Sequence, residues 1–186
     1  MRRESRAPDF TLREALGAFR RANGLPADET AHASWTCRIG TLTLRLPNFA
    51  WRRQAILAHD LHHVLAGYPC TVGGECQMAA WEFAAGRMPH WGAALFCLPL
   101  VPLGLFWQPR RMLRALRSGR RSYSLHGSNA TDRLLATPLL KARLEVVGAR
   151  VKRSWPDRVR FALFIRQAAA VVMVPLALLT AILAVA

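Results

Sequence analysis

Acidic residues are scarce in this chain of 186 residues, with 11 aspartates and glutamates against 26 lysines and arginines and a formal net charge of +15. Lysine is almost missing too, so arginine carries most of the positive charge. The balance is uneven: residues 1–90 contain 11 basic and eight acidic residues, and residues 91–186 contain 15 basic and three acidic ones. A basic half beside apolar segments favours an anionic membrane surface as a partner. Nucleic acid is the weaker interpretation, since no helix-turn-helix, zinc-finger or aromatic RNA-binding pattern occurs.

Cysteine motifs are also missing, and we expect no leader sequence. The four cysteines show no CxxC spacing, and the charged residues 1–10 are followed by no apolar run. We therefore expect free thiols in a reducing cytoplasm and no secretion. No flavin or nucleotide motif is visible, and the length suits one domain better than two.

Hydrophobic periodicity predicts an all-helical or mostly helical domain over residues 1–153. A helix that starts at an Asn48 N-cap and stops at Gly67 is followed by a loop over 68–74 and a second helix that begins at Glu75 and ends near Gly86. The other predicted elements are an amphipathic helix over 9–23, a strand or hairpin over 36–47 and an amphipathic helix over 134–153.

Two apolar segments suggest a membrane. Residues 91–107 carry no charge but contain two prolines, which favours a buried, re-entrant or interfacial segment over a spanning helix. Residues 168–186 are also uncharged, and a helix of that length is about 28 Å long, close to the hydrocarbon thickness. We expect residues 154–186 to be a basic flank and a C-terminal transmembrane anchor that leaves the main domain cytoplasmic.

The stretch "HDLHHVLAGYPCTVGGE", residues 59–75, gathers three histidines and two acids. On a helix, His59 and His63 lie within ~40° of each other, and Asp60 extends the arc to ~100°. A helix–loop–helix turn could bring the Glu75 carboxylate back over them. The set His59, Asp60, His63 and Glu75 offers nitrogen and oxygen donors, which suit a divalent metal such as zinc, iron, manganese or magnesium.

Other groups near this stretch have open roles. His62 could support a ligand or lie at the surface, and Glu82 could orient a ligand or be a solvated carboxylate. Cys70 and Cys76 flank the loop without a metal-binding spacing, and we interpret them as structural.

The pattern HDxxH, eleven residues, then E resembles the hallmark of the family of the fourth Coq protein of ubiquinone (coenzyme Q) biosynthesis. Here it reads His59-Asp60-Leu61-His62-His63, residues 64–74, then Glu75. The likeness is most specific over residues 54–105, and residues 130–152 look like the family's closing helix.

The resemblance implies a mostly helical, membrane-associated protein that holds a divalent metal through His59, Asp60, His63 and Glu75. It also implies a polyprenylated 4-hydroxybenzoate as substrate, oxidative decarboxylation at C1 of that ring, and a place in a biosynthetic complex. Within that scheme, residues 91–107 could line a slot for the isoprenoid tail, and Asp60 could carry a proton.

Three alternatives stay open. A zinc-dependent hydrolase would use Asp60 as the general base of an HExxH-like motif, although its side chain is shorter than that of glutamate. A phosphohydrolase of the HD type would need further His and Asp ligands. A non-enzymatic scaffold that binds a prenyl lipid would use the metal for structure or head-group recognition.

Overall fold

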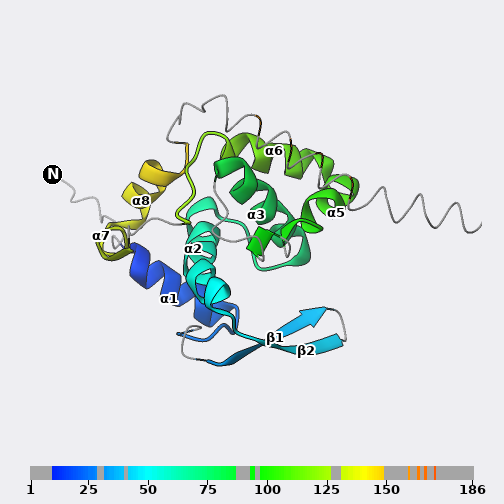
Figure 1. Ribbon diagram of the computed structural model, residues 1–186. Helices are drawn as coiled ribbons and strands as arrows, with labels where there is room; N and C mark the ends of the chain where they lie inside the picture. Colours follow the sequence, from blue (N-terminus) through cyan, green and yellow to red (C-terminus); the bar gives the residue numbers. More distant parts are fainter. Residues whose placement is uncertain are drawn as a thin grey trace, which may run out of the picture.

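The computed structural model describes residues 10–28, 32–39, 42–86, 93–94, 97–126 and 131–148, together with residues 159, 163, 166 and 170. Within these residues the chain is mostly helical, with seven helices and one two-stranded sheet (Figure 1). The prediction of a mostly helical fold is therefore confirmed.

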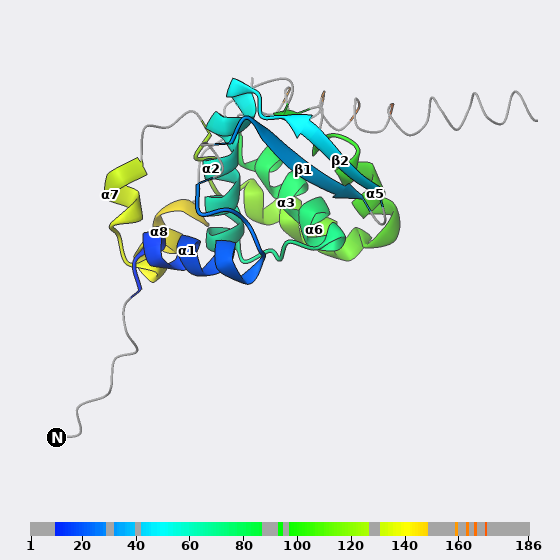
Figure 2. The ribbon, with the colours of Figure 1, turned by 90° about the horizontal axis from the view of Figure 1, so that it is seen from below.

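The N-terminal part forms one helix and one hairpin. Helix α1 (Leu12–Ala22) starts at a capping box, in which the Thr11 hydroxyl accepts from the Glu14 N–H and the Glu14 carboxylate accepts from the Thr11 N–H at 2.8 Å. Strands β1 (Ser34–Ile39) and β2 (Leu42–Pro47) pair antiparallel and lead into the next helix (Figure 2). The strand or hairpin predicted over 36–47 is thus a pair of antiparallel strands that begins two residues earlier, at Ser34.

Helices α2 (Ala50–Ala66) and α3 (Val72–Ala85) carry the opening motif. Gly67 ends α2 with a φ of 77°, a left-handed conformation that glycine adopts without strain. The predicted cap at Asn48 is wrong: the N-cap is Phe49, and the Asn48 side chain instead donates to the His32 carbonyl and accepts from Arg52.

Helix α3 begins three residues before the predicted start at Glu75. The Thr71 hydroxyl accepts from the Gly74 N–H at 3.2 Å and so supplies an N-cap that the prediction assigned to the loop. A Cβ on Gly74 would lie 1.9 Å from the Pro69 carbonyl oxygen, so only glycine permits this tight turn into α3. Glu75 consequently lies in the first turn of the helix.

Helices α5 (Leu100–Trp107) and α6 (Pro109–Gly119) both pack against α3, which forms the centre of the core (Figure 1). A Cβ on Gly104 of α5 would come within 2.7 Å of both Cys76 of α3 and Met112 of α6. The three helices therefore meet at a contact that has no room for a larger residue.

The helix predicted over 134–153 is replaced by two shorter ones, α7 (Thr131–Leu135) and α8 (Leu139–Val146). Pro138 lacks an N–H and separates them. This break lets the chain pair with α1, because the Leu12 N–H donates to the Thr137 carbonyl at 2.9 Å and the Leu139 N–H donates to the Phe10 carbonyl at 2.8 Å.

Among the helices built from described residues, none is both long and apolar enough to span a bilayer. The anchor predicted over 168–186 lies outside the described residues, apart from residue 170, as does part of the apolar segment 91–107.

Candidate metal centre

Three predicted ligands converge: His59 and His63 from α2 and Glu75 from the first turn of α3. The Nε2 atoms of the two histidines are 3.1 Å apart. Glu75 Oε2 lies 3.4 Å from His59 Nε2, and Glu75 Oε1 lies 3.4 Å from His63 Nε2. The two histidines thus present one nitrogen each, and Glu75 presents its carboxylate, to a common point.

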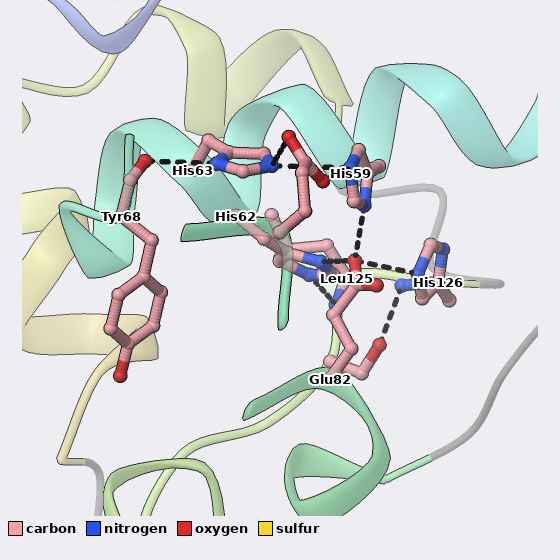
Figure 3. A network of polar contacts seen from close by, with 9 residues as sticks. His59, His62, His63, Tyr68, Glu82, Leu125 and His126 are labelled. Atoms are coloured by element: carbon pink, nitrogen blue, oxygen red, sulfur yellow. Dashed lines mark hydrogen bonds and ion pairs between the residues drawn. The ribbon is translucent and has the colours of Figure 1, made fainter. Parts of the chain in front are cut away.

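The hydrogen bonds on the far side of each ring fix which nitrogen faces that point. His63 Nδ1 lies 2.8 Å from the Tyr68 carbonyl oxygen, which can only accept, so Nδ1 carries the proton (Figure 3). His59 Nδ1 lies 3.2 Å from Glu82 Oε1 and donates in the same way. In the neutral rings both Nε2 lone pairs therefore face each other, an arrangement that a metal ion between them, or a proton on one of them, would stabilise.

The donor atoms lie close enough together to share one metal ion. Donors about 2.0–2.1 Å from a tetrahedral zinc ion are about 3.3 Å from one another. The two histidine nitrogens are 3.1 Å apart, and each lies 3.4 Å from a different oxygen of the Glu75 carboxylate. Three protein ligands plus an open position is the arrangement of catalytic zinc sites, and the group can hold a metal ion.

The donor group is partly exposed on the side of His59 and Glu75. The His63 side chain is 1% exposed, whereas the side chains of His59 and Glu75 are 23% and 32% exposed.

The electrostatics of the site favour positive charge at His59 Nε2. Burial alone would lower the pKa of His59, but Glu82 and Glu75 outweigh burial and raise that pKa well above its ordinary value. Burial would raise the pKa of Glu75, yet hydrogen bonds with His59 and His63 lower it to about 2. With neutral histidines, the two ionised glutamates give the site a charge of −2, which a divalent cation neutralises.

Asp60, predicted as a fourth ligand and as a proton carrier, is not among these converging donors. Its carboxylate is 4% exposed, and its Oδ2 accepts from Nε and Nη2 of Arg20, each at 2.8 Å. Arg20 and the neighbouring Phe19, which stacks on His63 with ring centroids 5.5 Å apart, come from α1. Asp60 thus attaches α1 to α2.

Glu82 is completely buried and ties His59 to two further histidines. Its Oε1 lies 2.7 Å from His62 Nδ1 and 3.1 Å from His126 Nε2, in addition to its contact with His59 (Figure 3). Burial would raise the pKa of Glu82, but these histidines lower it well below the ordinary value. Glu82 therefore accepts as a carboxylate and orients His59, the arrangement common behind metal-bound histidines.

The group His62, Glu82 and His126 could also be taken for a metal site, but the protonation of His62 opposes this. His62 Nε2 accepts from the Leu125 N–H at 2.9 Å, so its proton is on Nδ1, the atom that faces Glu82. Burial lowers the pKa of His62 to about 4, although Glu82 acts in the opposite direction. A neutral His62 with Nδ1 protonated offers Glu82 a hydrogen bond and has no lone pair for a metal there.

The sequence reasoning missed His126, Arg20 and Phe19. His126 follows α6 and is 44 residues from Glu82, so no spacing along one helix links them. Cys70, interpreted as structural, is half-buried, and burial together with Glu75 and Asp60 raises the pKa of its thiol to about 12. It is therefore a thiol at neutral pH.

Comparison of the chain with protein-family models, with curated proteins and with solved structures finds no match. The assignment of a function consequently depends on the geometry of this site and on the HDxxHx11E resemblance.

Proposed function

We propose that the chain binds one divalent metal ion through His59, His63 and Glu75, and that it acts on a polyprenylated 4-hydroxybenzoate in ubiquinone biosynthesis. The reaction is the oxidative removal of the C1 carboxylate. The single observation that supports a bound metal is the convergence of two imidazole nitrogens and a carboxylate at distances of 3.1–3.4 Å. The substrate class comes from the resemblance in the motif.

A bound metal would act as a Lewis acid and as an orienting template for the oxygens of the substrate. The chain itself contributes rigidity. Tyr68 and Glu82 hold the two histidine rings by their Nδ1 protons, and Phe19 covers the buried face of His63. We expect the aromatic acid to bind on the partly exposed side of His59 and Glu75.

The proposed reaction breaks the bond between C1 and its carboxyl group, releases carbon dioxide and forms a C1–hydroxyl bond. This change is a two-electron oxidation of the substrate. Dioxygen balances it together with a two-electron donor: one oxygen atom enters the C1–hydroxyl group, and the other leaves as water.

Two alternatives receive different support. A hydrolase of the HExxH type needs a free general base at Asp60, and the ion pair of Asp60 with Arg20 opposes that role. A non-enzymatic prenyl-lipid scaffold keeps the metal site and lacks turnover, so an assay separates it from the enzyme.

The test uses the full-length protein loaded with zinc, iron or manganese and a polyprenyl 4-hydroxybenzoate labelled with ¹³C in its carboxyl group, with dioxygen and a reductant. We expect labelled carbon dioxide and a C1-hydroxylated product by mass spectrometry. His63→Ala should abolish both. The matched control is His32→Ala, since His32 is exposed outside the site.

Metal-loaded wild type that releases no labelled carbon dioxide with any of the three metals would contradict the proposed reaction. If that protein still binds the labelled lipid, the scaffold becomes the better account. Equal turnover by His63→Ala would contradict the role of the site.

A further inference from the structure

In the part of the chain that the structure describes, the outer face of α5 is apolar and exposed. Leu103, Phe106 and Trp107 are 45%, 91% and 65% exposed. Their spacing of i, i+3 and i+4 puts them within an arc of about 100° on the helix. Val101 and Gly104 occupy the opposite side and are buried in the core. An apolar helix with its largest side chains turned outward needs an apolar environment.

The outer face of α6, which follows after Gln108, is basic. Arg110, Arg114 and Arg117 are exposed and fall within an arc of about 60°. The buried residues Met112, Ala115, Leu116 and Gly119 face α3 on the opposite side. Both helices pack against α3, so the apolar and the basic faces both turn away from the core (Figure 1).

The charge around these faces has one sign. Residues 110–121 contain six arginines, and the sequence has no acidic residue between Glu82 and Asp132. Aromatic and leucine side chains flanked by arginines are the composition of helices that lie in the interface of an anionic bilayer. The occupant that these faces fit must be apolar beside a layer of negative charge, which describes an anionic phospholipid surface.

The junction of α5 and α6 also contacts the first turn of α3, close in sequence to Glu75. Gln108 donates from its side-chain amide to the Gly73 carbonyl at 2.6 Å, and Gly73 is two residues before Glu75. A surface that contacts Trp107 therefore lies next to the first turn of α3, which carries the Glu75 carboxylate.

We propose that the outer faces of α5 and α6, formed by Leu103, Phe106, Trp107, Arg110, Arg114 and Arg117, dock on an anionic phospholipid bilayer and hold the metal centre at its surface. The apolar residues enter the acyl boundary, and the arginines bind the headgroups. The docking goes beyond the proposed reaction and does not depend on it.

The test measures whether Trp107 enters the bilayer, because other segments of the chain could also bind lipid. The full-length protein is mixed with vesicles of phosphatidylcholine and phosphatidylglycerol that carry bromine on their acyl chains. The fluorescence of Trp107→Phe, subtracted from that of wild type, isolates the signal of Trp107. The matched control is Trp35→Phe, which isolates a half-buried tryptophan on β1.

We expect the Trp107 signal to be quenched on anionic vesicles and the Trp35 signal to be unaffected. Each arginine near an anionic surface strengthens binding about fivefold, so replacing Arg110, Arg114 and Arg117 by Gln should weaken docking of Trp107 roughly 100-fold. A control that replaces the exposed Arg21, Arg45 and Arg133 changes the net charge equally and should leave the quenching intact. Phe106→Ser should reduce quenching, and Leu144→Ser on α8, which is 71% exposed, should not.

Unquenched Trp107 on vesicle-bound protein would overturn the proposal, because another segment would then hold the protein there. Equal quenching on neutral and anionic vesicles would overturn the role of the arginines. If the Trp107 fluorescence is already that of a buried tryptophan before lipid is added, and increasingly so at higher protein concentration, a second copy of the chain covers this face. That result would also overturn the proposal.

Discussion

Glu82→Gln tests how the buried carboxylate supports the metal site. In the wild type, Oε1 of Glu82 accepts from ring nitrogens of His59, His62 and His126 at 3.2, 2.7 and 3.1 Å. The substitution keeps the size of the side chain and removes its charge. Removing a carboxylate that orients a metal-bound histidine weakens metal affinity about 10–100-fold. That loss equals about 1.4–2.8 kcal/mol of binding free energy.

The same substitution has a separate effect on stability. A glutamine oxygen can satisfy part of the three N–H donors, so the free energy of unfolding of the metal-free protein should fall by about 1–3 kcal/mol, the range for a buried polar group that loses its partner. Zinc affinity is measured by competition with a chromophoric chelator, and stability by urea unfolding. The control is Glu145→Gln on the exposed face of α8. Unchanged zinc affinity in folded Glu82→Gln would refute the role assigned to Glu82.

Three further outcomes are expected. Protons compete with the metal at His59, whose pKa is raised because Glu82 and Glu75 outweigh burial. Metal affinity should therefore increase between about pH 6 and pH 8, by about tenfold per pH unit as long as His59 of the metal-free protein is protonated. A metal affinity that does not change with pH in calorimetric titrations would contradict this. Arg20→Gln leaves the Asp60 carboxylate buried without its cation and should reduce the free energy of unfolding by about 3–5 kcal/mol. The double variant with Asp60→Asn should recover part of that loss in urea unfolding, and simple additivity would show that the pair is not coupled. Gly119→Ala puts a Cβ 2.3 Å from the Trp81 carbonyl oxygen and should cost about 1–3 kcal/mol, so an unchanged Tm would argue against such close contact of α3 and α6.

The sequence predicted the parts of the site that lie on one helix or on two consecutive helices. The i, i+4 spacing of His59 and His63 places both rings on one face of α2, and the short loop after Gly67 brings Glu75 opposite them. These are local relations, and helical geometry alone determines them.

The relations that the sequence did not predict are long-range. Asp60 lies beside His59 in the sequence and shares part of its helix face, yet a guanidinium from α1, 40 residues earlier, binds its carboxylate. His126 reaches Glu82 from the segment after α6. Spacing cannot reveal either contact, because each depends on how separate helices pack.

Capping and helix breaks explain the errors in element boundaries. Thr71 starts α3 early because its hydroxyl can reach the Gly74 N–H, and Pro138 divides the last predicted amphipathic helix. The periodicity of apolar residues gives the extent of a helix only approximately, whereas the local hydrogen-bonding groups fix its ends.

The metal content of the purified full-length protein tests the central claim most directly. Mass spectrometry of the wild type, after reconstitution and removal of free ions, should find about one divalent metal ion per chain, as three converging ligands imply. His63→Ala and Glu75→Ala should lose the metal and keep the helical circular dichroism of the wild type, while His32→Ala should retain the metal. Wild type without metal, or metal retained by both ligand variants, would contradict a metal centre at His59, His63 and Glu75.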